Sequence, residues 1–276
     1  MSGSVETWSG KDRGDENFPV GSVLIAPRLR PHIHAFYAFA RNGDDIADSP
    51  ELAPEEKVAR LDAMEDVLLG RREDGSPSAT RLRASLAATG VTPVHGCELL
   101  VAFRRDATKQ RYATWDELLD YCRYSAMPVG RHVLDLHGEA RETWVPSDAL
   151  CAVLQVLNHL QDGSKDLAAL DRCYLPRDLL ERFGGRVEDL HGAAETPGLR
   201  GCFSVLLDEC DQMIETAVFL PRRTRDLRLR LETAVIVGLA RRLARRLRAG
   251  DPVAGRVKLT KTDAVFSVLG SLGALL

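Results

Sequence analysis

The stretch "LQVLNHLQDGSKDLAAL", residues 154–170, decides the fold because it joins an apolar helical face to a row of polar side chains. Apolar residues recur at helical spacing through its first half and predict a buried face. Asn158, Asp162 and Asp166 follow at strict four-residue spacing, so on a helix they project in nearly one direction. The pattern predicts a helix over 146–170 that presents three oxygen-bearing side chains together.

A second stretch, "FYAFARNGDDIAD" at residues 36–48, repeats this arrangement. Its aromatic residues predict the buried face of a helix over 31–48. Asp44 and Asp48 have the same four-residue relation, whereas Asp45 points about 100° away and is a weaker candidate. Asp is a mediocre helix former, and like charges four residues apart repel each other. The carboxylates therefore mark either a solvated helix end or a site for something positive.

For one isolated pair of carboxylates, a solvated stripe is the better interpretation. Two such sets at the ends of otherwise apolar helices favour a site, because the carboxylates converge if the helices pack side by side. Four converging Asp side chains need a compensating charge, and a hard divalent cation supplies it. We expect Mg²⁺, with Mn²⁺ as a substitute, to bridge these side chains to a diphosphate. The predicted metal ligands are Asp44, Asp48, Asn158, Asp162 and Asp166.

Neither GxGxxG nor GxxxxGK[ST] occurs in the chain, so the sequence gives no support to NADPH as a cofactor. Cations accompany both acidic stretches and suit a diphosphate whose charge the metal does not fully cancel. We expect Arg41, Lys165 and Arg172 to contact it, although each alone is better interpreted as a surface or salt-bridge residue.

Helical patterns follow one another along most of the chain, and alternating period-two runs are nearly absent. We expect an all-α protein with a single domain over 1–276, of which residues 1–16 are loosely held. The expected helices cover residues 31–48, 54–70, 78–89, 96–109, 114–138, 146–170, 198–219, 224–249 and 260–275.

Composition favours an ordinary globular protein: 45% of residues are hydrophobic, 28% are charged, and the net charge is −3. That balance argues against nucleic acid as a partner. The six cysteines show no CxxC pair, and no apolar run is long enough to cross a bilayer. We therefore expect reduced thiols and a cytoplasmic location.

Several further motifs carry a family resemblance: "ENFPVGS" at 16–22, "YCRYSAMPVGRHVL" at 121–134 and "NHLQDGSKDLAALDRCYLP" at 158–176. With the paired acidic motifs, they resemble the squalene/phytoene synthase family of head-to-head prenyl transferases over nearly the whole chain. Within it they are most similar to the hydroxysqualene synthase branch of hopanoid synthesis. The resemblance implies an all-α isoprenoid-synthase fold whose central apolar cavity has the acidic motifs at its mouth.

The resemblance also implies roles for individual residues. Catalytic roles fall to Asp44, Asp48, Asp162, Asp166, Tyr37 and Tyr121. Substrate-binding roles fall to Asn17, Phe18, Arg41, Tyr124, Val129, Gln155, Asn158, Lys165, Arg172 and Tyr174. From spacing alone the tyrosines are better interpreted as core aromatics, but a cavity that holds a carbocation gives aromatic faces a second use. Met127 stands where this branch is expected to carry Asn.

Three functions remain open at this point. The first is conversion of presqualene diphosphate and water to hydroxysqualene and diphosphate, alongside other enzymes of that pathway. The second is head-to-head condensation of two prenyl diphosphates. The third is a non-catalytic lipid-binding or assembly role, which the intact acidic motifs disfavour.

The carboxyl-terminal part has two interpretations as well. Ten arginines lie between Arg222 and Arg248, and the chain ends in the apolar stretch "AVFSVLGSLGALL". A solvated helix followed by a buried one is the simpler interpretation. The alternative is peripheral contact with the inner membrane face.

Overall fold

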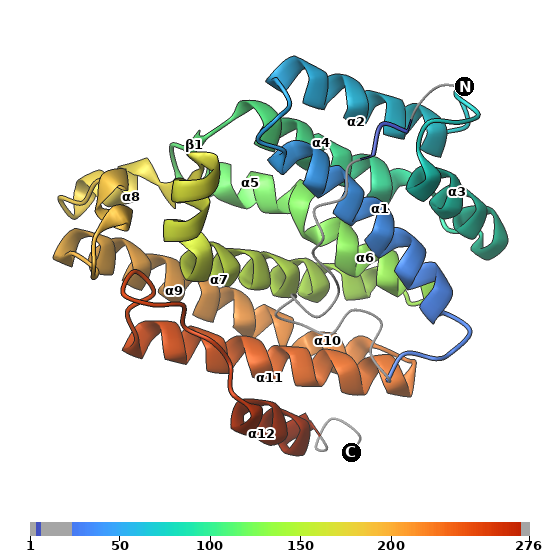
Figure 1. The fold of residues 1–276 in the computed structure, drawn as a ribbon. Coiled ribbons are helices and arrows are strands. Elements are labelled where there is room, and N and C mark those ends of the chain that lie inside the picture. The colour runs from blue at the N-terminus through green and yellow to red at the C-terminus, as the bar shows by residue number, and fades with distance from the viewer. Residues whose placement is uncertain (1–3, 7–23, 272–276) are drawn as a thin grey trace. The chain divides into compact units, whose positions relative to one another are not determined.

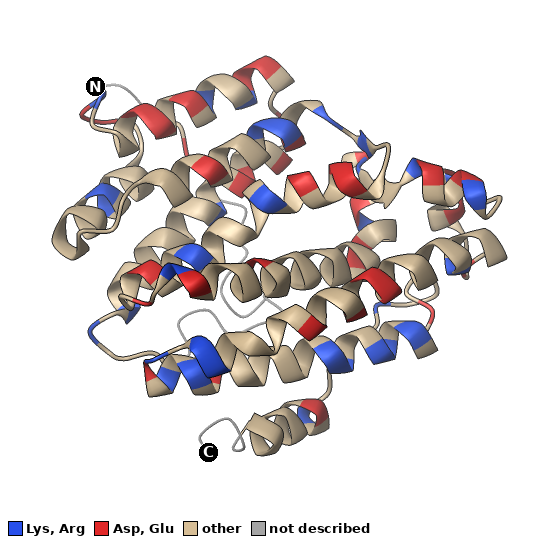
Figure 2. Ribbon diagram, turned by 180° about the vertical axis from the view of Figure 1, so that it is seen from behind, with Lys and Arg blue, Asp and Glu red and all other residues tan. Residues whose placement is uncertain are grey.

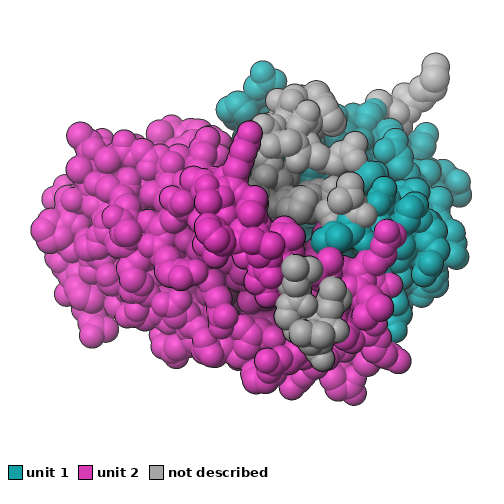
Figure 3. Space-filling view, turned by 90° about the horizontal axis from the view of Figure 1, so that it is seen from below, with its two compact units in different colours: residues 1–109, 128–139 teal, residues 110–127, 140–276 magenta. Residues whose placement is uncertain are grey.

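The computed structural model describes residues 4–6 and 24–271, which divide into two compact units (Figures 1 and 3). Unit 1 comprises residues 1–109 and 128–139, and unit 2 comprises residues 110–127 and 140–276. Helices dominate both units, so the predicted all-α class is confirmed. The single functional domain expected from the sequence stays a prediction.

Unit 1 is built from five of the described helices around one apolar core. These helices are α1 (Arg30–Asp48), α2 (Pro54–Leu68), α3 (Pro77–Thr89), α4 (Val94–Thr108) and α6 (Met127–Leu136). Helix α1 contacts α2, α3 and α4. Its fully buried Phe39 and Ile46 belong to that core, as the periodic pattern predicts. The acidic end of α1 is thus fixed by the packing of its apolar face.

Glycine lets α1 and α4 approach closely just before the acidic residues. A Cβ atom added to Gly43 would lie 2.6 Å from Cδ2 of Phe103 on α4. Only a residue without a side chain fits beside that ring in its present place. Gly43 therefore helps to set the position of the last turn of α1.

Unit 2 contains the remaining described elements. These are β1 (Arg111–Tyr112), α5 (Trp115–Ser125), η1 (Arg141–Thr143), α7 (Trp144–Leu170), β2 (Cys173–Pro176), α8 (Arg177–Arg182), η2 (Val187–His191), α9 (Pro197–Ala217), α10 (Phe219–Arg223), α11 (Leu227–Ala249) and α12 (Lys261–Ser271). Helix α7 packs against α9 and α11, which also contact each other, and α12 packs against α11. Helix α7 is thereby held along its length by its buried apolar side chains.

The two strands form a short parallel sheet that the sequence did not indicate. Arg111 pairs with Cys173, and the backbone amide of Cys173 donates to the carbonyl of Gln110 at 2.9 Å. Runs of two and four residues are too short to show a period-two pattern. The sheet holds the chain that leaves α7 against the chain that enters α5.

The prediction of a single helix over 114–138 is wrong, because the chain forms two helices, α5 and α6, which are separated at Ala126. Ala126 has φ −124° and ψ −45°, outside regular helical values. Pro128 explains the break: it has no amide hydrogen to donate to the Tyr124 carbonyl one turn earlier, so it fits the first turn of a new helix and not the middle of a continuous one. The predicted start of this segment is confirmed, since the Thr114 hydroxyl accepts from the Glu117 amide at 3.2 Å.

Residues 4–6 are the described part of the segment that was expected to be loosely held. The Val5 amide donates to the Gly75 carbonyl at 2.8 Å. A carboxylate oxygen of Glu6 accepts from the Ser76 hydroxyl at 2.6 Å and from the Ser78 amide at 2.7 Å. These contacts tie residues 4–6 to the start of α3, contrary to the expectation.

Candidate active site

The acidic residues of α1 lie in its last two turns, where the backbone itself disfavours negative charge. Free carbonyl groups give the carboxyl end of a helix a partial negative charge, and no basic residue occupies the last turn of α1. Asp44 and Asp48 are partly exposed, whereas Asp45 is buried. Carboxylates in this position reduce helix stability, which favours a functional explanation for them.

Arg41 supplies the positive charge that the structure shows at this end of α1. Its guanidinium contacts the Asp44 carboxylate at 3.1 Å and the Asp45 carboxylate at 3.0 Å. Asp45 is therefore the buried partner that orients Arg41, with its side chain 4% exposed. Asp44 remains 37% exposed and accessible to a ligand. The expected contact of Arg41 with a diphosphate stays a prediction.

Helix α7 carries the second acidic row as predicted. Asn158, Asp162 and Asp166 all lie within its helical range, four residues apart. The helix ends at Asp171, whose positive φ of 50° turns the chain back, and the Arg172 amide then donates to the Asp166 carbonyl at 3.3 Å. As in α1, no basic residue occupies the last turn. In the α7 row, only Asp166 lies close enough to the carboxyl end for the helix dipole to disfavour its charge.

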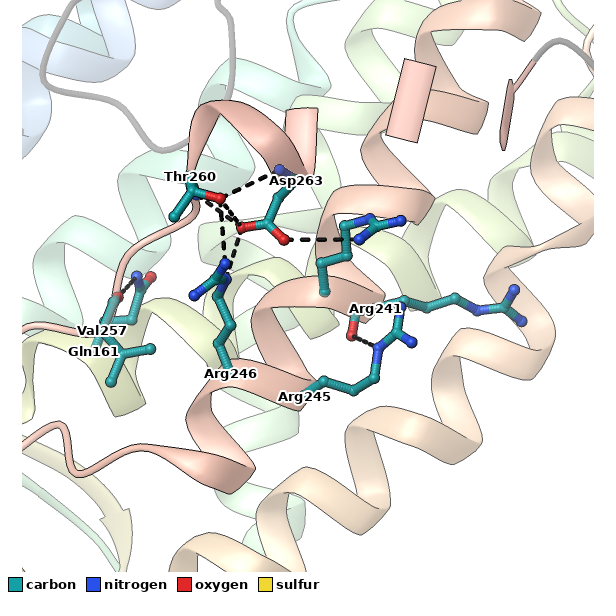
Figure 4. Close-up of polar contacts among 8 residues, drawn as sticks. Gln161, Arg241, Arg245, Arg246, Val257, Thr260 and Asp263 are labelled. Carbon is teal, nitrogen blue, oxygen red and sulfur yellow. Dashed lines mark hydrogen bonds and ion pairs between the residues drawn. The ribbon is translucent and has the colours of Figure 1, made fainter. Parts of the chain in front are cut away.

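Arg256 is a site residue that sequence reasoning missed. Its Nε and one terminal nitrogen contact the two carboxylate oxygens of Asp162 at 2.8 and 2.9 Å. Next to it, the Gln161 side chain donates to the Val257 carbonyl at 2.5 Å (Figure 4). Arg256 and Asp162 are 94 positions apart in the chain, so no local sequence pattern could reveal their contact. This two-pronged contact neutralises the central carboxylate of the α7 row.

An aromatic cluster lies beside the acidic row inside unit 2. The Tyr174 hydroxyl is 3.4 Å from that of Tyr121, and the buried Arg172 guanidinium donates to it at 3.3 Å. The His159 ring stacks on Tyr174 with the centroids 3.6 Å apart. Tyr112 packs against both tyrosines. The structure thus brings together the predicted residues Tyr121, Arg172 and Tyr174, with the Arg172 guanidinium buried. The expected contact of Arg172 with a diphosphate stays a prediction.

His159 is held as a neutral imidazole in this cluster. Burial lowers its pKa to about 3, and the positive charge of Arg172 acts in the same direction. Neither ring nitrogen has a hydrogen-bond partner among the described residues. His159 is buried and stacked on Tyr174, so its contacts are those of a structural residue.

The remaining predicted residues are placed as follows. Lys165 and Val129 are exposed, and Tyr37, Tyr124 and Gln155 are partly buried on α1, α5 and α7. Arg123 lies over the Tyr124 ring, 5.4 Å from its centroid. Asn17 and Phe18 fall outside the described residues. The expected role of Lys165 stays a prediction.

The oxygen atoms of the two acidic rows suit a hard cation, although the described side chains are not arranged as a complete metal site. Within residues 4–6 and 24–271, no three His, Cys, Asp or Glu side chains gather in a geometry that would hold a metal ion. Each acidic row nevertheless offers only carboxylate and amide oxygens, which Mg²⁺ and Mn²⁺ prefer. Arg41 and Arg256 pair with one carboxylate in each row. The residues fit a metal that binds together with an anionic substrate.

The six cysteines agree with the expected reduced thiols. All six are free, and Cys122, Cys173, Cys202 and Cys210 are buried. Their burial disfavours the thiolate form, so they offer no reactive nucleophile.

Comparison with known proteins identifies the family. The model of the squalene/phytoene synthase family matches residues 11–263, which span both units. A hydroxysqualene synthase of Rhodopseudomonas palustris is 47% identical over 99% of this chain and 94% of its own length. A hydroxysqualene synthase of Zymomonas mobilis is 43% identical over 93% of this chain and 87% of its own.

Solved structures agree in fold. Squalene synthase HpnC from Alicyclobacillus acidocaldarius is 34% identical, with a TM-score of 0.74 over 86% of this chain and 90% of its own. A dehydrosqualene synthase solved with a ligand is 22% identical, and its TM-score of 0.80 over 95% of this chain and 92% of its own supports the fold alone. The expected isoprenoid-synthase fold is confirmed. On these matches, the chain belongs to the squalene/phytoene synthase family.

Proposed function

We propose that this protein converts presqualene diphosphate and water to hydroxysqualene and diphosphate. The observation that carries the proposal is identity of 43–47% to three hydroxysqualene synthases over 93–99% of this chain. Both acidic sets of the chain lie inside these matches. Phytoene synthases are more distant, at 29–33% identity.

The proposal assigns metal binding to Asp44 and Asp48 on α1, and to Asn158, Asp162 and Asp166 on α7. Mg²⁺, or Mn²⁺ in its place, would supply positive charge that stabilises diphosphate as a leaving group. Arg41 and Arg256 already pair with members of these rows, so they are positioned to exchange a carboxylate for a diphosphate oxygen. Arginine suits this exchange because its planar fork binds either anion through two donors.

The chemical step breaks the bond between carbon and the diphosphate oxygen, and diphosphate leaves with the electron pair. The resulting carbocation then accepts an oxygen lone pair from water, and loss of one water proton gives the alcohol. Tyrosine faces stabilise a cation without acting as nucleophiles. We assign this role to Tyr37, Tyr121 and Tyr124, with Tyr174 and the neutral His159 fixing the orientation of Tyr121.

Product analysis with two substrates tests the proposal. Purified protein with Mg²⁺ is incubated separately with presqualene diphosphate and with farnesyl diphosphate, without NADPH, and the lipid extract is analysed by mass spectrometry. We expect hydroxysqualene from presqualene diphosphate and no product from farnesyl diphosphate. Formation of presqualene diphosphate from farnesyl diphosphate would instead assign the condensing reaction. No product from either substrate would favour the non-catalytic alternative.

The same proposal places the protein in the cytoplasm, next to the inner membrane face. Its substrate and product are both long-chain lipids, and the enzymes that supply and consume them act on the same chains. Among the described helices, none combines the length and apolarity needed to cross a bilayer. Any membrane contact of the described part therefore uses a surface.

A further inference from the structure

Helix α12 has the reverse of the usual amphipathic arrangement. Its buried residues are Asp263, Ser267 and Ser271, all polar and four positions apart. Its large apolar side chains are exposed, by 56% at Val265, 52% at Phe266, 48% at Val268 and 56% at Leu269. At about 100° per residue, the centres of the two sets lie about 180° apart on the helix. The apolar face of α12 therefore points away from α11.

Polar contacts rather than apolar packing fix this orientation (Figure 4). The Asp263 carboxylate contacts the Arg246 guanidinium of α11 at 2.6 Å and that of Arg242 at 3.7 Å. It also accepts from the backbone amide and the hydroxyl of Thr260, at 2.8 and 2.7 Å. On the same side, a Cβ atom added to Gly238 would lie 3.2 Å from Ser267, so the two helices approach closely.

These contacts are strong enough to decide which face is buried. Burial alone would raise the pKa of Asp263, but hydrogen bonds from Thr260 and the charge of Arg246 outweigh it and lower the pKa to about 2. The carboxylate is thus charged and paired at neutral pH. Rotation of α12 to bury Phe266 would expose this ion-paired face, so the outward apolar face is a built feature of the fold.

Basic side chains border the apolar face. Lys258 and Lys261 are exposed where the chain enters α12, and Asp263 is the sole acid between Arg256 and Ser271. The Arg242 guanidinium lies over the Phe266 ring, 5.1 Å from its centroid. In Figure 2, blue bands mark α11, whereas α12 is uncoloured except near its start. Exposed Arg241 and Arg245 extend the basic surface along α11.

We propose that the exposed face of α12 docks onto an anionic phospholipid surface. The docking face consists of Val265, Phe266, Val268 and Leu269, bordered by Lys258, Lys261 and Arg242. Apolar side chains enter the boundary between headgroups and acyl chains while the neighbouring cations bind lipid phosphates. An eleven-residue helix is about 16 Å long and cannot cross the hydrocarbon core, so it lies along the surface.

Charge and size favour lipid over a second copy of this chain. A two-fold interface would bring the same lysines and arginines of both copies together. Four side chains on one short helix also offer less area than the roughly 800 Å² per partner of a stable protein interface. An anionic bilayer instead complements the charges and accepts apolar groups over any area.

Vesicle co-sedimentation of the full chain tests this inference without measuring turnover. The lipids are equal parts phosphatidylglycerol and phosphatidylcholine, compared with phosphatidylcholine alone, at low and high salt. We expect binding to the anionic vesicles that weakens in high salt. The double variant Phe266→Ser/Leu269→Ser should lower the partition coefficient at least tenfold, because two inserted apolar groups are lost. The variant Lys258→Glu/Lys261→Glu should lose the preference for anionic lipid.

Matched controls separate this face from general surface hydrophobicity. Val145→Ser and Leu227→Ser remove side chains that are 63% and 61% exposed on other helices, and both should bind vesicles as the unmodified chain does. Turnover of detergent-dispersed presqualene diphosphate should be unchanged in Phe266→Ser/Leu269→Ser, which keeps this test independent of the proposed reaction. The inference is overturned if the unmodified chain does not bind anionic vesicles at low salt, or if Phe266→Ser/Leu269→Ser binds them equally well. A concentration-dependent dimer that this variant abolishes would assign the face to a second copy.

Discussion

Arg256 binds both carboxylate oxygens of Asp162, at 2.8 and 2.9 Å, and so occupies the centre of the second acidic row. Asp162 is largely buried, with its side chain 12% exposed, so an unpaired charge there would be unfavourable. The Arg256 guanidinium compensates the charge of this carboxylate. Binding of a metal at Asp162 requires Arg256 to move away.

The first prediction concerns the exchange between Arg256 and a metal. Arg256→Met leaves Asp162 without its cation, so the variant should melt at a lower temperature in EDTA, by the equivalent of about 1–3 kcal/mol. Because Mg²⁺ no longer competes with a guanidinium, it should raise the melting temperature more in the variant than in the unmodified chain. Differential scanning fluorimetry over a Mg²⁺ series measures both effects.

Arg248→Met is the matched control for this series. Arg248 also contacts two carboxylate oxygens, of Asp208 and Asp211 at 2.9 and 2.8 Å, but on the exposed surface between α9 and α11. The Arg248→Met variant should melt in EDTA at nearly the same temperature as the unmodified chain, and Mg²⁺ should shift the two melting temperatures equally. An equal Mg²⁺ response in Arg256→Met and the unmodified chain would place the metal elsewhere.

The second prediction concerns the acidic rows themselves. Asp44→Ala, Asp48→Ala, Asp162→Ala and Asp166→Ala should each lower kcat by orders of magnitude, because the metal loses a ligand. Far-ultraviolet circular dichroism should show the helical fold intact. Excess EDTA should abolish turnover of the unmodified chain, and added Mg²⁺ should restore it. Full activity in Asp48→Ala and Asp162→Ala would be incompatible with the proposed site.

The third prediction uses the buried histidine. His159 has a pKa of about 3 when folded and about 6.5 when unfolded, so below pH 6.5 the unfolded state binds more protons. The stability that this difference contributes is present above pH 6.5 and is lost as the pH falls toward 3, by about 1.4 kcal/mol per unit. His159→Phe should therefore lose less stability than the unmodified chain between pH 7 and pH 5.

Urea unfolding of both proteins across this pH range measures the difference. The comparison cancels other titrating groups, such as His132, whose burial on α6 also lowers its pKa to about 3. It also cancels Glu195, whose pKa burial raises to about 7 and whose effect has the opposite sign. Parallel pH profiles for the two proteins would contradict the assigned neutral state.

The fourth prediction concerns the close approach of α1 and α4. Gly43→Ala should destabilise unit 1 by about 1–3 kcal/mol, because the new Cβ atom overlaps the Phe103 ring. Phe103→Leu in the same chain should recover part of that loss by making room. Additive effects of the two substitutions in urea unfolding would show that the contact does not limit the packing of α1.

Much of the fold could be predicted from apolar periodicity and helix-end signals. The ranges of α1, α2, α3 and α7 agree with the prediction to within two residues at each end. The error over 114–138 comes from local chemistry that overrides periodicity, because Pro128 interrupts an otherwise continuous apolar pattern between α5 and α6. The strands β1 and β2 depend on tertiary contacts and leave no periodic signal.

The site was predictable only where its residues share a helix. Helical geometry places Asp44 beside Arg41, and Asp162 beside Asp166, because residues three or four positions apart are neighbours on a helix. Arg256 meets Asp162 through the packing of distant segments, and that contact leaves no mark on local sequence. The outward face of α12 was missed for a different reason. Apolar residues at a chain end suggest burial, whereas here Asp263 and its arginine partners take the buried face.

Isotope labelling of the product tests the proposed reaction most directly. Purified protein is incubated with presqualene diphosphate and Mg²⁺ in ¹⁸O-labelled water, with NADPH present and its absorbance followed. If water captures the carbocation, the product is hydroxysqualene that carries one heavy oxygen, and the NADPH absorbance stays constant. Squalene formed with stoichiometric consumption of NADPH, or hydroxysqualene without the label, would contradict the proposed function.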